Sequence, residues 1–465
     1  MPVILGGGIS GISAAYYLSK KGINSTKLFE ASKRVGGWIQ TNENVDFLFE
    51  TGPRTIRPAG IKGKNTLNLI EEIGLTDQIV PITKDHIAAK NRMLYVNCQL
   101  CPLPSSFGGL FKKLPPFSKP LIFSVLRDLR AAPAKVHDES IYSFFERRFG
   151  TEMAKYAISS MICGICAGNA KEISVKFLME DIFNNEQKYG GVIKGAIMSM
   201  LNTEKANKKI EPPSDIVKKS IQDHWRIYSF KNGMETLPTT LAANLNDNIS
   251  FNASCDKIVF NKNNIEVRIN GKETVQTNHL ISSIPSYKLS SLLKPQHPEL
   301  AAELQQIPYV DVAVVNLQYD KDDLLKLPAF GFLVPPSENL PILGVIYDSC
   351  CFDMKGKTVL TIMMGGAWFR EKFGINPKET DLLNVAVGQI RNILKIEQEP
   401  NAMRVQVLKN CIPQYVVGHH DRVQRIREYI RQRKLPLSLC GAAYDGVGLN
   451  DVIYSARQCV DNNFN

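Results

Sequence analysis

The sequence predicts a protein of the α/β class in which segments from both ends of the chain build one domain. Near the N-terminus, an apolar strand at 3–5 runs into a glycine-rich turn and then into a segment with helical apolar spacing. Near the C-terminus, a strand at 436–441 runs into a second glycine-rich turn and a helix at about 450–460. Strand, glycine turn and helix in this order are typical of a doubly wound sheet. We therefore expect a discontinuous domain.

The first turn has the spacing of a dinucleotide-binding site, and it consists of Gly6, Gly7, Gly8, Ile9, Ser10 and Gly11. Three of its glycines stand in G-x-G-x-x-G register, which lets backbone N–H groups and a helix N-terminus meet a pyrophosphate. A second strand ends at Glu30, where a carboxylate would hold the ribose 2′-OH. A glycine fingerprint alone also fits an ordinary tight turn, but the strand, helix and acid together favour a nucleotide.

The residues after this acid favour flavin over nicotinamide. The run Glu30-Ala31-Ser32-Lys33-Arg34-Val35-Gly36-Gly37-Trp38 resembles the E-A-x-x-R-x-G-G signature of the FAD-dependent amine oxidase superfamily. The resemblance implies noncovalent FAD and a Rossmann-like FAD-binding domain, with the second glycine pair close to the ribityl chain. The alternative for this run is a basic surface loop that contains two glycines.

The C-terminal turn has the same arrangement as the first, a glycine-rich turn between a strand and a helix. It runs from Gly441 through Ala442 and on to Val447, Gly448 and Leu449, between the last strand and the last helix. A helix N-terminus there would direct partial positive charge at an anion. In the superfamily, that anion is the N1/C2=O edge of the reduced isoalloxazine.

Composition limits the class of protein further. The chain has 465 residues, which is too many for one core, and its ten cysteines do not suggest a disulfide scaffold. Two C-x-x-C pairs, Cys98/Cys101 and Cys163/Cys166, are better explained as core thiols than as zinc ligands, because no flanking knuckle or histidine pattern supports a metal. We predict no metal site.

The net charge of +11 suggests either nucleic acid or an anionic membrane as a partner. The basic residues are scattered and no nucleic-acid motif is present, so we expect no nucleic acid. No apolar run reaches the roughly 18–20 residues that span a bilayer. No signal-peptide pattern precedes the first strand, so we expect any import signal to lie within the chain; whether the N-terminus is complete stays open.

The segment 103–135 is the most unusual part of the chain. Its phenylalanines and leucines are interleaved with six basic residues and one acidic residue, a net charge of +5. Apolar aromatic residues with basic flanks, broken by prolines, suit an element that sits in a membrane without crossing it. The alternative is a proline-rich loop over the core.

The remaining elements follow from periodicity. We predict a helix at 65–74, strands at 93–96 and around 99–100, and a helical region at 138–206 with breaks at Gly164, Gly168 and Gly190-Gly191. Next come a strand at 225–230, a turn and helix over 231–245, and strands at 249–251, 257–260, 265–269 and 279–283. Alternating strands and helices fill 310–400.

Interior motifs narrow the resemblance. The chain is similar to the protoporphyrinogen oxidase family, animal mitochondrial type, in the segments 50–58, 91–96, 116–120, 314–319, 410–415 and 444–451. The resemblance runs over essentially the full length. It implies a mixed-sheet substrate domain and a helical membrane-binding domain beside the FAD-binding domain.

Site residues carried over by this resemblance fall into two groups. Arg92 corresponds to a guanidinium that clamps a substrate propionate, a task that suits arginine geometry; without the resemblance it would be a surface arginine. Gly164 corresponds to backbone at the macrocycle, and Phe330, Leu333 and Met363 to apolar residues that sandwich it. Further flavin contacts are implied at Gly52, Pro53, Arg54, Thr55 and Cys255. Cys163 and Cys166 depart from the family pattern, so the pocket wall differs there.

The implied reaction is the oxidation of protoporphyrinogen IX to protoporphyrin IX in haem biosynthesis. A bridge carbon gives hydride to the flavin, a proton is lost, and oxygen accepts the electrons as peroxide over three cycles. No catalytic triad or general base emerges from the sequence. The implied partners are the tetrapyrrole, oxygen, a membrane surface and, as candidates, a second copy and ferrochelatase. The implied location is the intermembrane-space side of the mitochondrial inner membrane.

The expected domain division has seven segments. FAD binding is assigned to 1–80, 225–290 and 410–465, substrate binding to 81–95, 191–224 and 291–409, and membrane binding to 96–190. Two alternatives remain open. Another FAD-dependent amine oxidase-like oxidase or desaturase would keep both glycine turns but lack the Arg92 strand. A non-catalytic prenyl-GTPase escort-type protein would share the fold without flavin, which the intact glycine motifs argue against.

Overall fold

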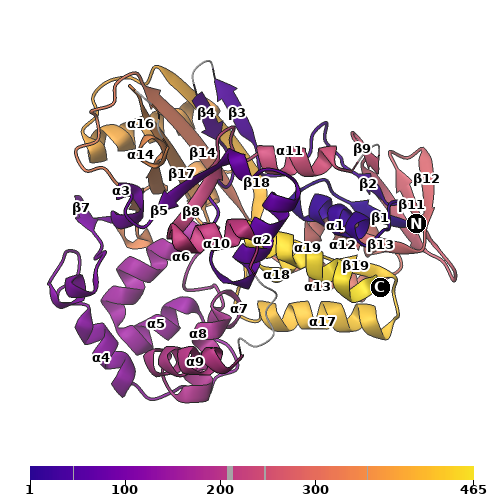
Figure 1. Ribbon diagram of the computed structural model, residues 1–465, viewed down its shortest axis with the longest axis horizontal. Helices are drawn as coiled ribbons and strands as arrows, with labels where there is room; N and C mark the ends of the chain where they lie inside the picture. The colour runs from indigo at the N-terminus through magenta and orange to yellow at the C-terminus, as the bar shows by residue number, and fades with distance from the viewer. Residues whose placement is uncertain (45–46, 207–212, 246–247, 353, 355, 465) are drawn as a thin grey trace. The chain divides into compact units, whose positions relative to one another are not determined.

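The computed structural model describes residues 1–44, 47–206, 213–245, 248–352, 354 and 356–464 (Figure 1). The chain divides into two compact units. Unit 1 comprises 1–81, 213–308 and 421–465, and unit 2 comprises 82–212 and 309–420. The N-terminal and C-terminal segments therefore belong to one unit, as the paired glycine turns predict. The finer division into substrate and membrane-binding domains stays a prediction.

Unit 1 is built on a parallel sheet of five strands in the order β19-β13-β1-β2-β9. Its strands are β1 (Pro2–Leu5), β2 (Lys27–Phe29), β9 (Ile249–Ser250), β13 (His279–Ser282) and β19 (Leu437–Leu439). Every residue of β1 is buried, as expected for a central parallel strand covered on both faces. Because β1 lies between β13 and β2, the turn that follows it leaves from the middle of the sheet.

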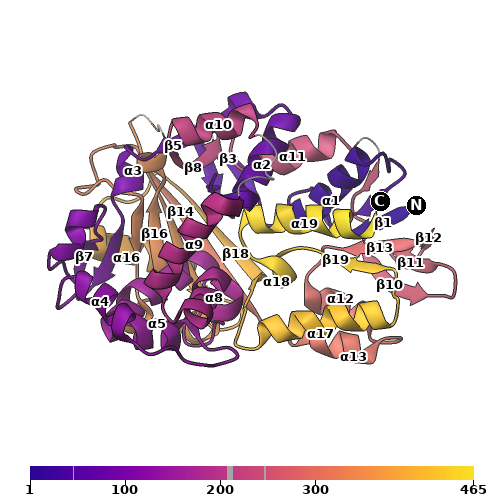
Figure 2. The same cartoon turned by 60° about the horizontal axis from the view of Figure 1, so that its bottom comes forward.

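Unit 1 also contains helices from several parts of the chain. They are α1 (Ile9–Lys20), α2 (Gly60–Glu72), α10 (Asp215–Gln222), α11 (Thr236–Ala243), α12 (Ser286–Leu293), α13 (Pro298–Gln305), most of α17 (His419–Gln432), α18 (Ala442–Asp445) and α19 (Leu449–Asn463). The first and last helices, α1 and α19, lie side by side (Figures 1 and 2). Ile12, Leu18, Ile453 and Val460 from these two helices share one core cluster.

Two antiparallel pieces complete unit 1. They are the hairpin β3 (Thr41–Asn44) and β4 (Phe47–Glu50) and the three-stranded sheet β10 (Cys255–Phe260), β11 (Ile265–Ile269) and β12 (Glu273–Thr277). The strand β8 (Trp225–Phe230) pairs with β5 (Ile79–Thr83), which follows the turn η1 (Thr76–Gln78) and crosses from unit 1 into unit 2.

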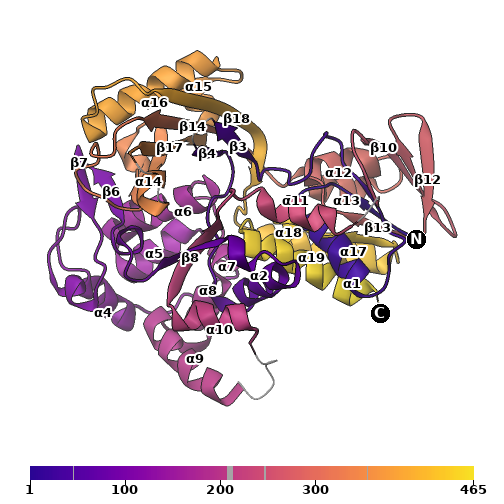
Figure 3. The same ribbon diagram turned by 45° about the horizontal axis from the view of Figure 1, so that its top comes forward.

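Unit 2 holds a seven-stranded mixed sheet in the order β18-β14-β17-β16-β15-β6-β7. Its strands are β6 (Met93–Val96), β7 (Gln99–Pro102), β14 (Tyr309–Tyr319), β15 (Gly331–Leu333), β16 (Ile342–Tyr347), β17 (Thr358–Gly366) and β18 (Ala402–Pro413). Only the β15–β6 pair is parallel among these described strands. α16 (Glu379–Leu394) covers one face, where Leu382 and Ile390 join the core of Leu317 and Ile362, and α6 (Ser159–Cys166) lies against the other (Figure 3).

A helical region also belongs to unit 2. It contains α3 (Ile87–Lys90), η2 (Phe107–Phe111), α4 (Ile122–Arg130), α5 (Ile141–Phe149), the π-helical turn η3 (Met153–Ile158), α6, α7 (Val175–Leu178), α8 (Glu180–Tyr189) and α9 (Val192–Ala206). Shorter pieces follow in η6 (Pro336–Glu338), α14 (Asp348–Cys351) and α15 (Phe369–Phe373). Within the described part of the chain, none of the helices combines the length and the apolar character needed to cross a bilayer.

Several predicted elements differ from the structure. The helix predicted at 65–74 begins earlier, at Gly60, and β12 was missed because its residues Glu273–Thr277 are mostly polar. The break predicted at Gly164 is wrong, since this glycine lies inside α6, which ends at Cys166 before Ala167 with φ of +50°. Strands and helices do not simply alternate over 310–400, because four strands dominate up to Gly366 and one long helix follows.

Candidate flavin and substrate sites

The turn between β1 and α1 needs glycine at two positions for its own packing. A Cβ on Gly11 would lie 1.9 Å from the Gly6 carbonyl oxygen, and a Cβ on Gly6, with φ of +99°, would lie 2.7 Å from Ser283 Oγ. Both contacts are shorter than any side chain tolerates. These two glycines therefore let α1 start directly above β1.

Gly8 is different, because the protein itself leaves room there. The nearest atom to a Cβ built on Gly8 is the Gly37 Cα, at 4.0 Å, and Gly8 pairs with Gly36 as an isolated bridge. Glycine at this position is thus not explained by contacts within the chain. The prediction that a pyrophosphate binds at the start of α1 is consistent with this open space, because such a ligand closely approaches the backbone.

Glu30 lies at the end of β2, beside this turn, as predicted. Its carboxylate accepts hydrogen bonds from Gly7 N at 2.6 Å and from Ser32 N at 2.8 Å. A Cβ on Gly7 would lie 2.9 Å from the Glu30 Cβ, so glycine lets the two segments meet. Ala253 N donates to Glu30 O, and Cys255, two residues later, begins β10. Burial raises the pKa of the Cys255 thiol to about 11.

The second glycine pair is shaped by Arg34. Its guanidinium donates to the carbonyl oxygens of Val35 at 2.9 Å, Ile39 at 3.0 Å and Gly37 at 2.5 Å, and lies 3.4 Å from Glu235 Oε1. Gly36 N in turn donates to Gly7 O at 2.9 Å. Arg34 therefore fixes the loop that joins the two glycine motifs, rather than presenting an unused charge to a ligand.

The remaining residues predicted to contact the flavin are spread over one stretch of unit 1. Gly52 packs beneath Trp38, because a Cβ there would lie 2.0 Å from the Trp38 carbonyl oxygen, and the Trp38 side chain is left exposed. Arg54 is buried and donates to Glu50 O at 3.4 Å. Ala31 and Pro53 are exposed, and Thr55 is half-buried.

The C-terminal turn reaches the first one within unit 1. A Cβ on Gly441, with φ of +112°, would lie 3.2 Å from Ser10 Oγ, so the two turns are neighbours. Gly448 precedes α19, and its N–H donates to Asp451 Oδ2 at 3.2 Å. The residues Ala442, Val447, Gly448 and Leu449 are thus placed where the two ends of the chain meet.

The five predicted substrate residues lie in unit 2, and two of them, Leu333 and Met363, lie on the face of the sheet opposite α16. Leu333 pairs with Gly344, and Gly344 pairs with Met363, so the two larger side chains flank a glycine on one row. A Cβ on Gly164 would lie 3.1 Å from Leu333 Cδ2, which brings α6 onto the same row.

Arg92 lies at the edge of this row. Leu333 also pairs with Leu94, and Arg92 alternates with Met93 so that it projects to the Leu94 side. The Arg92 guanidinium carbon lies 5.9 Å from the centre of the Phe330 ring, a cation–π distance. A cation and an aromatic ring therefore border an apolar strip.

Sequence reasoning missed a buried polar chain on this face. Asn316 Nδ2 donates to Thr361 Oγ1 at 2.7 Å, and Thr361 Oγ1 donates to Asp348 Oδ2 at 2.6 Å. All three are buried. The only sequence signal was a polar residue at alternate positions within otherwise apolar strands.

The two departing cysteines line the same region. Burial raises the pKa values of Cys163 and Cys166 to about 12, so both remain thiols. Cys163 also lines a cavity of about 260 Å³ with Leu343, Trp368 and Lys372. Among the described residues, no group of His, Cys, Asp and Glu is arranged to hold a metal ion.

Comparison with known proteins establishes the family. The model of the flavin-containing amine oxidoreductase family matches residues 9–462. Protoporphyrinogen oxidases of Bos taurus and Homo sapiens are 38% and 36% identical to the chain, over 98% of it and 96% of their own lengths. The chain belongs to the protoporphyrinogen oxidase family. Its cofactor is FAD, and it is an FAD-dependent oxidoreductase.

Solved structures show the same fold. A crystal structure from Exiguobacterium sp. 255-15 matches with a TM-score of 0.79 at 23% identity, covering 99% of this chain and 98% of the other. Cyclohexylamine oxidase from Brevibacterium oxydans IH-35A matches with a TM-score of 0.69 at 12% identity, covering 99% and 98%. Protoporphyrinogen oxidase family members thus share their architecture with oxidases that act on other compounds.

We expect Gly8→Val to fold but to lose FAD, because its Cβ fits the protein and fills the space beside the backbone. The flavin absorbance per mole of purified protein measures the loss. Gly388→Val in α16 is the matched control, since a Cβ there meets nothing within 4 Å. A Gly8→Val protein that purified with full flavin content would contradict this assignment.

Arg34→Met should weaken FAD binding by loosening the 35–39 loop. One lost charge-assisted hydrogen bond is worth about 1.5–3 kcal/mol, so we expect the Kd to rise by roughly tenfold to a hundredfold. Titration of the apoprotein with FAD measures it, and Lys33→Met, at the exposed neighbour, is the control. Equal Kd values for wild type and Arg34→Met would show that the loop does not depend on this guanidinium.

Proposed function

We propose that the chain oxidises protoporphyrinogen IX to protoporphyrin IX in haem biosynthesis. The observation that carries the proposal is the identity of 36–38% to animal protoporphyrinogen oxidases over nearly the full chain. The cation beside an apolar strip in unit 2 supports it, because the substrate is a large apolar macrocycle with carboxylates only on its side arms.

Arg92 is proposed to bind one propionate and so to select one orientation of the macrocycle. A planar guanidinium can pair with both oxygens of a carboxylate, and the Phe330 ring packs near it. An apolar slot alone would accept the macrocycle in several rotated positions. One fixed charge pair would therefore decide which bridge carbon is presented for oxidation.

The apolar row is proposed to bind the faces of the macrocycle. Leu333 and Met363 are half-buried side chains separated by Gly344, which leaves a shallow gap between them. Because Gly164 has no side chain, only the backbone of α6 lies beside Leu333 at this position. Flat apolar surface with one charged edge suits a planar ligand better than a small amine.

The glycine turns of unit 1 are proposed to hold FAD through the residues placed above. When bound, FAD supplies the hydride acceptor of the reaction, with molecular oxygen as the proposed final acceptor and peroxide as by-product. The chain's own part is binding, orientation and exclusion of water. Glu30 and the N-terminus of α1 would hold the nucleotide, and the Gly446–Gly448 turn would lie at the flavin edge.

Two alternative functions are weaker. Another FAD-dependent oxidase or desaturase of the same fold would require a different substrate face, and the Arg92–Phe330 pair would have no task in it. A non-catalytic escort-type protein would not need the open space beside Gly8. Both alternatives predict no reaction with a porphyrinogen.

Porphyrin fluorescence, recorded together with oxygen uptake, tests the proposed reaction. The purified protein in detergent should convert protoporphyrinogen IX to fluorescent protoporphyrin IX with three oxygen molecules consumed for each porphyrin. Catalase addition should return part of the oxygen if peroxide is the product. A yellow, folded protein that leaves the porphyrinogen at the rate of spontaneous oxidation would refute the proposal.

Arg92→Ala should lower kcat/KM by roughly thirtyfold, which corresponds to about 2 kcal/mol. This is the low end for a lost charge pair, because Arg92 is exposed at the rim. Arg92→Lys should recover only part of the loss, since it keeps the charge without the fork. Lys90→Ala, at an exposed cation on α3, is the control. Wild-type kcat/KM in Arg92→Ala would show that Arg92 does not bind the propionate.

The chain is also proposed to sit on a membrane through the segment 103–135, without crossing it. Phe107, Phe111 and Phe123 are 74%, 54% and 55% exposed, and the six basic residues of the segment are exposed as well. Exposed aromatic rings with cations around them suit an anionic lipid surface. By family resemblance, the proposed location is the intermembrane-space side of the mitochondrial inner membrane, with a second copy and ferrochelatase as candidate partners.

Replacing Lys112 and Lys113 with Glu should weaken binding to anionic vesicles by about 1 kcal/mol for each charge changed. The measurement is flotation with vesicles of phosphatidylcholine and phosphatidylglycerol. A pair of exposed lysines in unit 1, Lys262 and Lys272, provides the same change in net charge as a control. If both double variants floated equally, the segment would not be the binding element.

A further inference from the structure

The cavity of about 260 Å³ in unit 2 adjoins the row of residues proposed to bind the macrocycle. Three residues that line it are direct chain neighbours of residues in that row, and the pairs are Cys163 with Gly164, Val334 with Leu333, and Leu343 with Gly344. Val334 N donates to Leu343 O at 2.9 Å, so the pairing of β15 with β16 continues up to the cavity. The cavity therefore extends the proposed substrate face beyond the end of β15.

Arg92 and the cavity lie at opposite ends of β15. Phe330, which lies beside Arg92, comes directly before this strand, and Pro335, which lines the cavity, comes shortly after it. Five residues of extended chain span roughly 16 Å. A ligand that lay along β15 would therefore have one edge at Arg92 and its opposite edge at the cavity.

The cavity combines an apolar wall with one cation. Leu343 and Trp368 contribute apolar surface, and Lys372 is the one cation among the described residues that line the cavity. The Lys372 side chain is 19% exposed, and its ammonium donates to Asn339 Oδ1. A charge this well shielded from water pairs strongly with a carboxylate that enters the cavity.

The acid beside Lys372 does not fully occupy it. Glu371 Oε1 lies 3.2 Å from Lys372 Nζ, but the Glu371 side chain is 62% exposed, so water weakens this ion pair. An ammonium group has three N–H donors, and its contacts with Asn339 and Glu371 use two of them. Lys372 therefore keeps a donor for a further acceptor.

The volume suits one substituted ring of a tetrapyrrole. An apolar cavity of about 150 Å³ holds a benzene molecule, so the larger volume here holds a five-membered ring and a side arm. In protoporphyrinogen IX, the edge opposite the propionates carries vinyl groups, which Leu343 and Trp368 would contact. In coproporphyrinogen III, the same positions carry propionates, and Lys372 would pair with a carboxylate there.

We infer that this cavity is a second carboxylate subsite, and that the chain therefore also oxidises porphyrinogens with carboxylates at both edges, such as coproporphyrinogen III. The inference rests on the proposed oxidation of protoporphyrinogen IX and widens its substrate class. The redox step is the same, since six hydrogen atoms leave the macrocycle and three oxygen molecules take them up as three molecules of peroxide. Lys372 takes no part in that step and acts only on which side arms are accepted.

The first arm of the test compares the two substrates by porphyrin fluorescence and oxygen uptake. Wild type should oxidise coproporphyrinogen III as well as protoporphyrinogen IX. In Lys372→Ala, the ratio of kcat/KM for coproporphyrinogen III to kcat/KM for protoporphyrinogen IX should fall about tenfold, mainly through KM, as expected for one lost charge-assisted hydrogen bond. Lys378→Ala, at an exposed lysine of unit 2, is the control.

The second arm removes the competing acid. Glu371→Gln should raise the same ratio by about threefold, because the carboxylate of the substrate no longer competes with an exposed ion pair for Lys372. Glu379→Gln, at an exposed acid of α16, is the matched control. Opposite shifts from two adjacent residues are a readout that a general loss of folding would not give.

The third arm measures binding without turnover. Coproporphyrin III, the stable oxidised product, should bind Lys372→Ala with a Kd about tenfold above that of wild type in a fluorescence titration. Its tetramethyl ester has no carboxylates, so it should bind wild type and Lys372→Ala with equal Kd values.

The outcomes separate this inference from the proposed function. A wild type that oxidises protoporphyrinogen IX but leaves coproporphyrinogen III at the rate of spontaneous oxidation would overturn the inference alone. An unchanged substrate ratio and an unchanged Kd in Lys372→Ala would overturn it too. If wild type oxidised neither substrate, the proposed function would fail, and with it the inferred activity. Should Lys372→Ala lose its FAD and fold, an unchanged ratio in Glu371→Gln would still overturn the role of Lys372.

Discussion

The close approach of backbone to backbone around the first glycine turn is the constraint on which the cofactor half of the molecule depends. Gly6 and Gly11 let α1 start directly on top of β1, and Gly7 lets Glu30 come within hydrogen-bond distance. These contacts leave Gly8 as a position where the backbone is open. The proposed cofactor site is therefore an opening in the backbone at Gly8, which the packing of the neighbouring glycines leaves free, rather than a row of side chains.

Close packing of backbone segments also shapes the loop that Arg34 fixes and the C-terminal turn. Three carbonyl oxygens on one guanidinium hold the second glycine pair, and Gly441 lies against Ser10 from the other end of the chain. Segments from both ends of the chain therefore meet at the first turn. The substrate face proposed for unit 2 is simpler, since sheet register alone sets Leu333, Gly344 and Met363 in one row.

The glycine motifs were the most predictable part of the molecule, because their spacing reflects a steric demand that sequence records directly. Arg92 and the apolar row could be named only through family resemblance, since pairing between distant strands is not visible in local pattern. The break predicted at Gly164 failed for a physical reason. That glycine is needed for the close contact of α6 with Leu333, and a helix tolerates it at a cost of about 1 kcal/mol.

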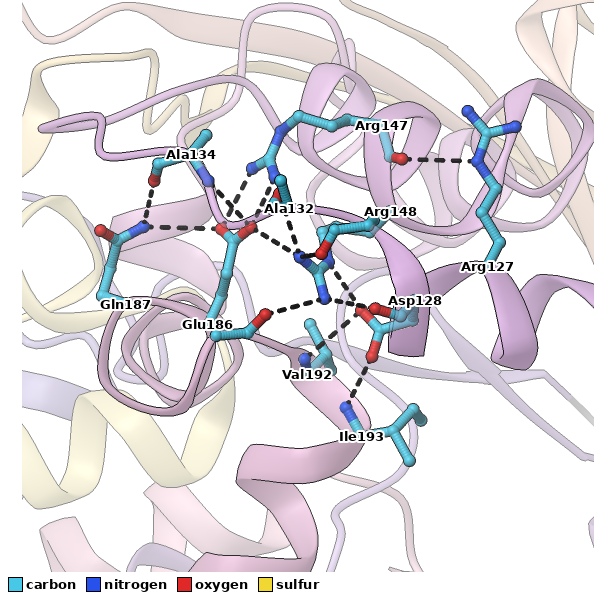
Figure 4. Close-up of polar contacts among 12 residues, drawn as sticks. Arg127, Asp128, Ala132, Ala134, Arg147, Arg148, Glu186, Gln187, Val192 and Ile193 are labelled. Atoms are coloured by element: carbon cyan, nitrogen blue, oxygen red, sulfur yellow. Dashed lines mark hydrogen bonds and ion pairs between the residues drawn. The ribbon is translucent and has the colours of Figure 1, made fainter.

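The orientation of α4 could not be predicted either. Its aromatic residues were recognised in the sequence, but which side would face the protein depended on Arg148 and Glu186, which lie far along the chain. Removing one partner of such a buried pair costs about 3–5 kcal/mol. The buried ion pairs around Asp128 of α4 (Figure 4) therefore stabilise an arrangement that leaves Phe123, Leu126 and Leu129 exposed. This is the reverse of ordinary core formation, and it is consistent with the proposal that the segment 103–135 lies against lipid.

Anaerobic mixing of the FAD-loaded protein with protoporphyrinogen IX tests the central claim most directly, because one absorbance measurement reports on both the cofactor proposed for unit 1 and the substrate proposed for unit 2. The account predicts that the visible absorbance of the oxidised flavin bleaches, and that it returns when oxygen is admitted while porphyrin fluorescence appears. A flavin that stays oxidised with protoporphyrinogen IX, in a protein whose flavin a chemical reductant still bleaches, would contradict it.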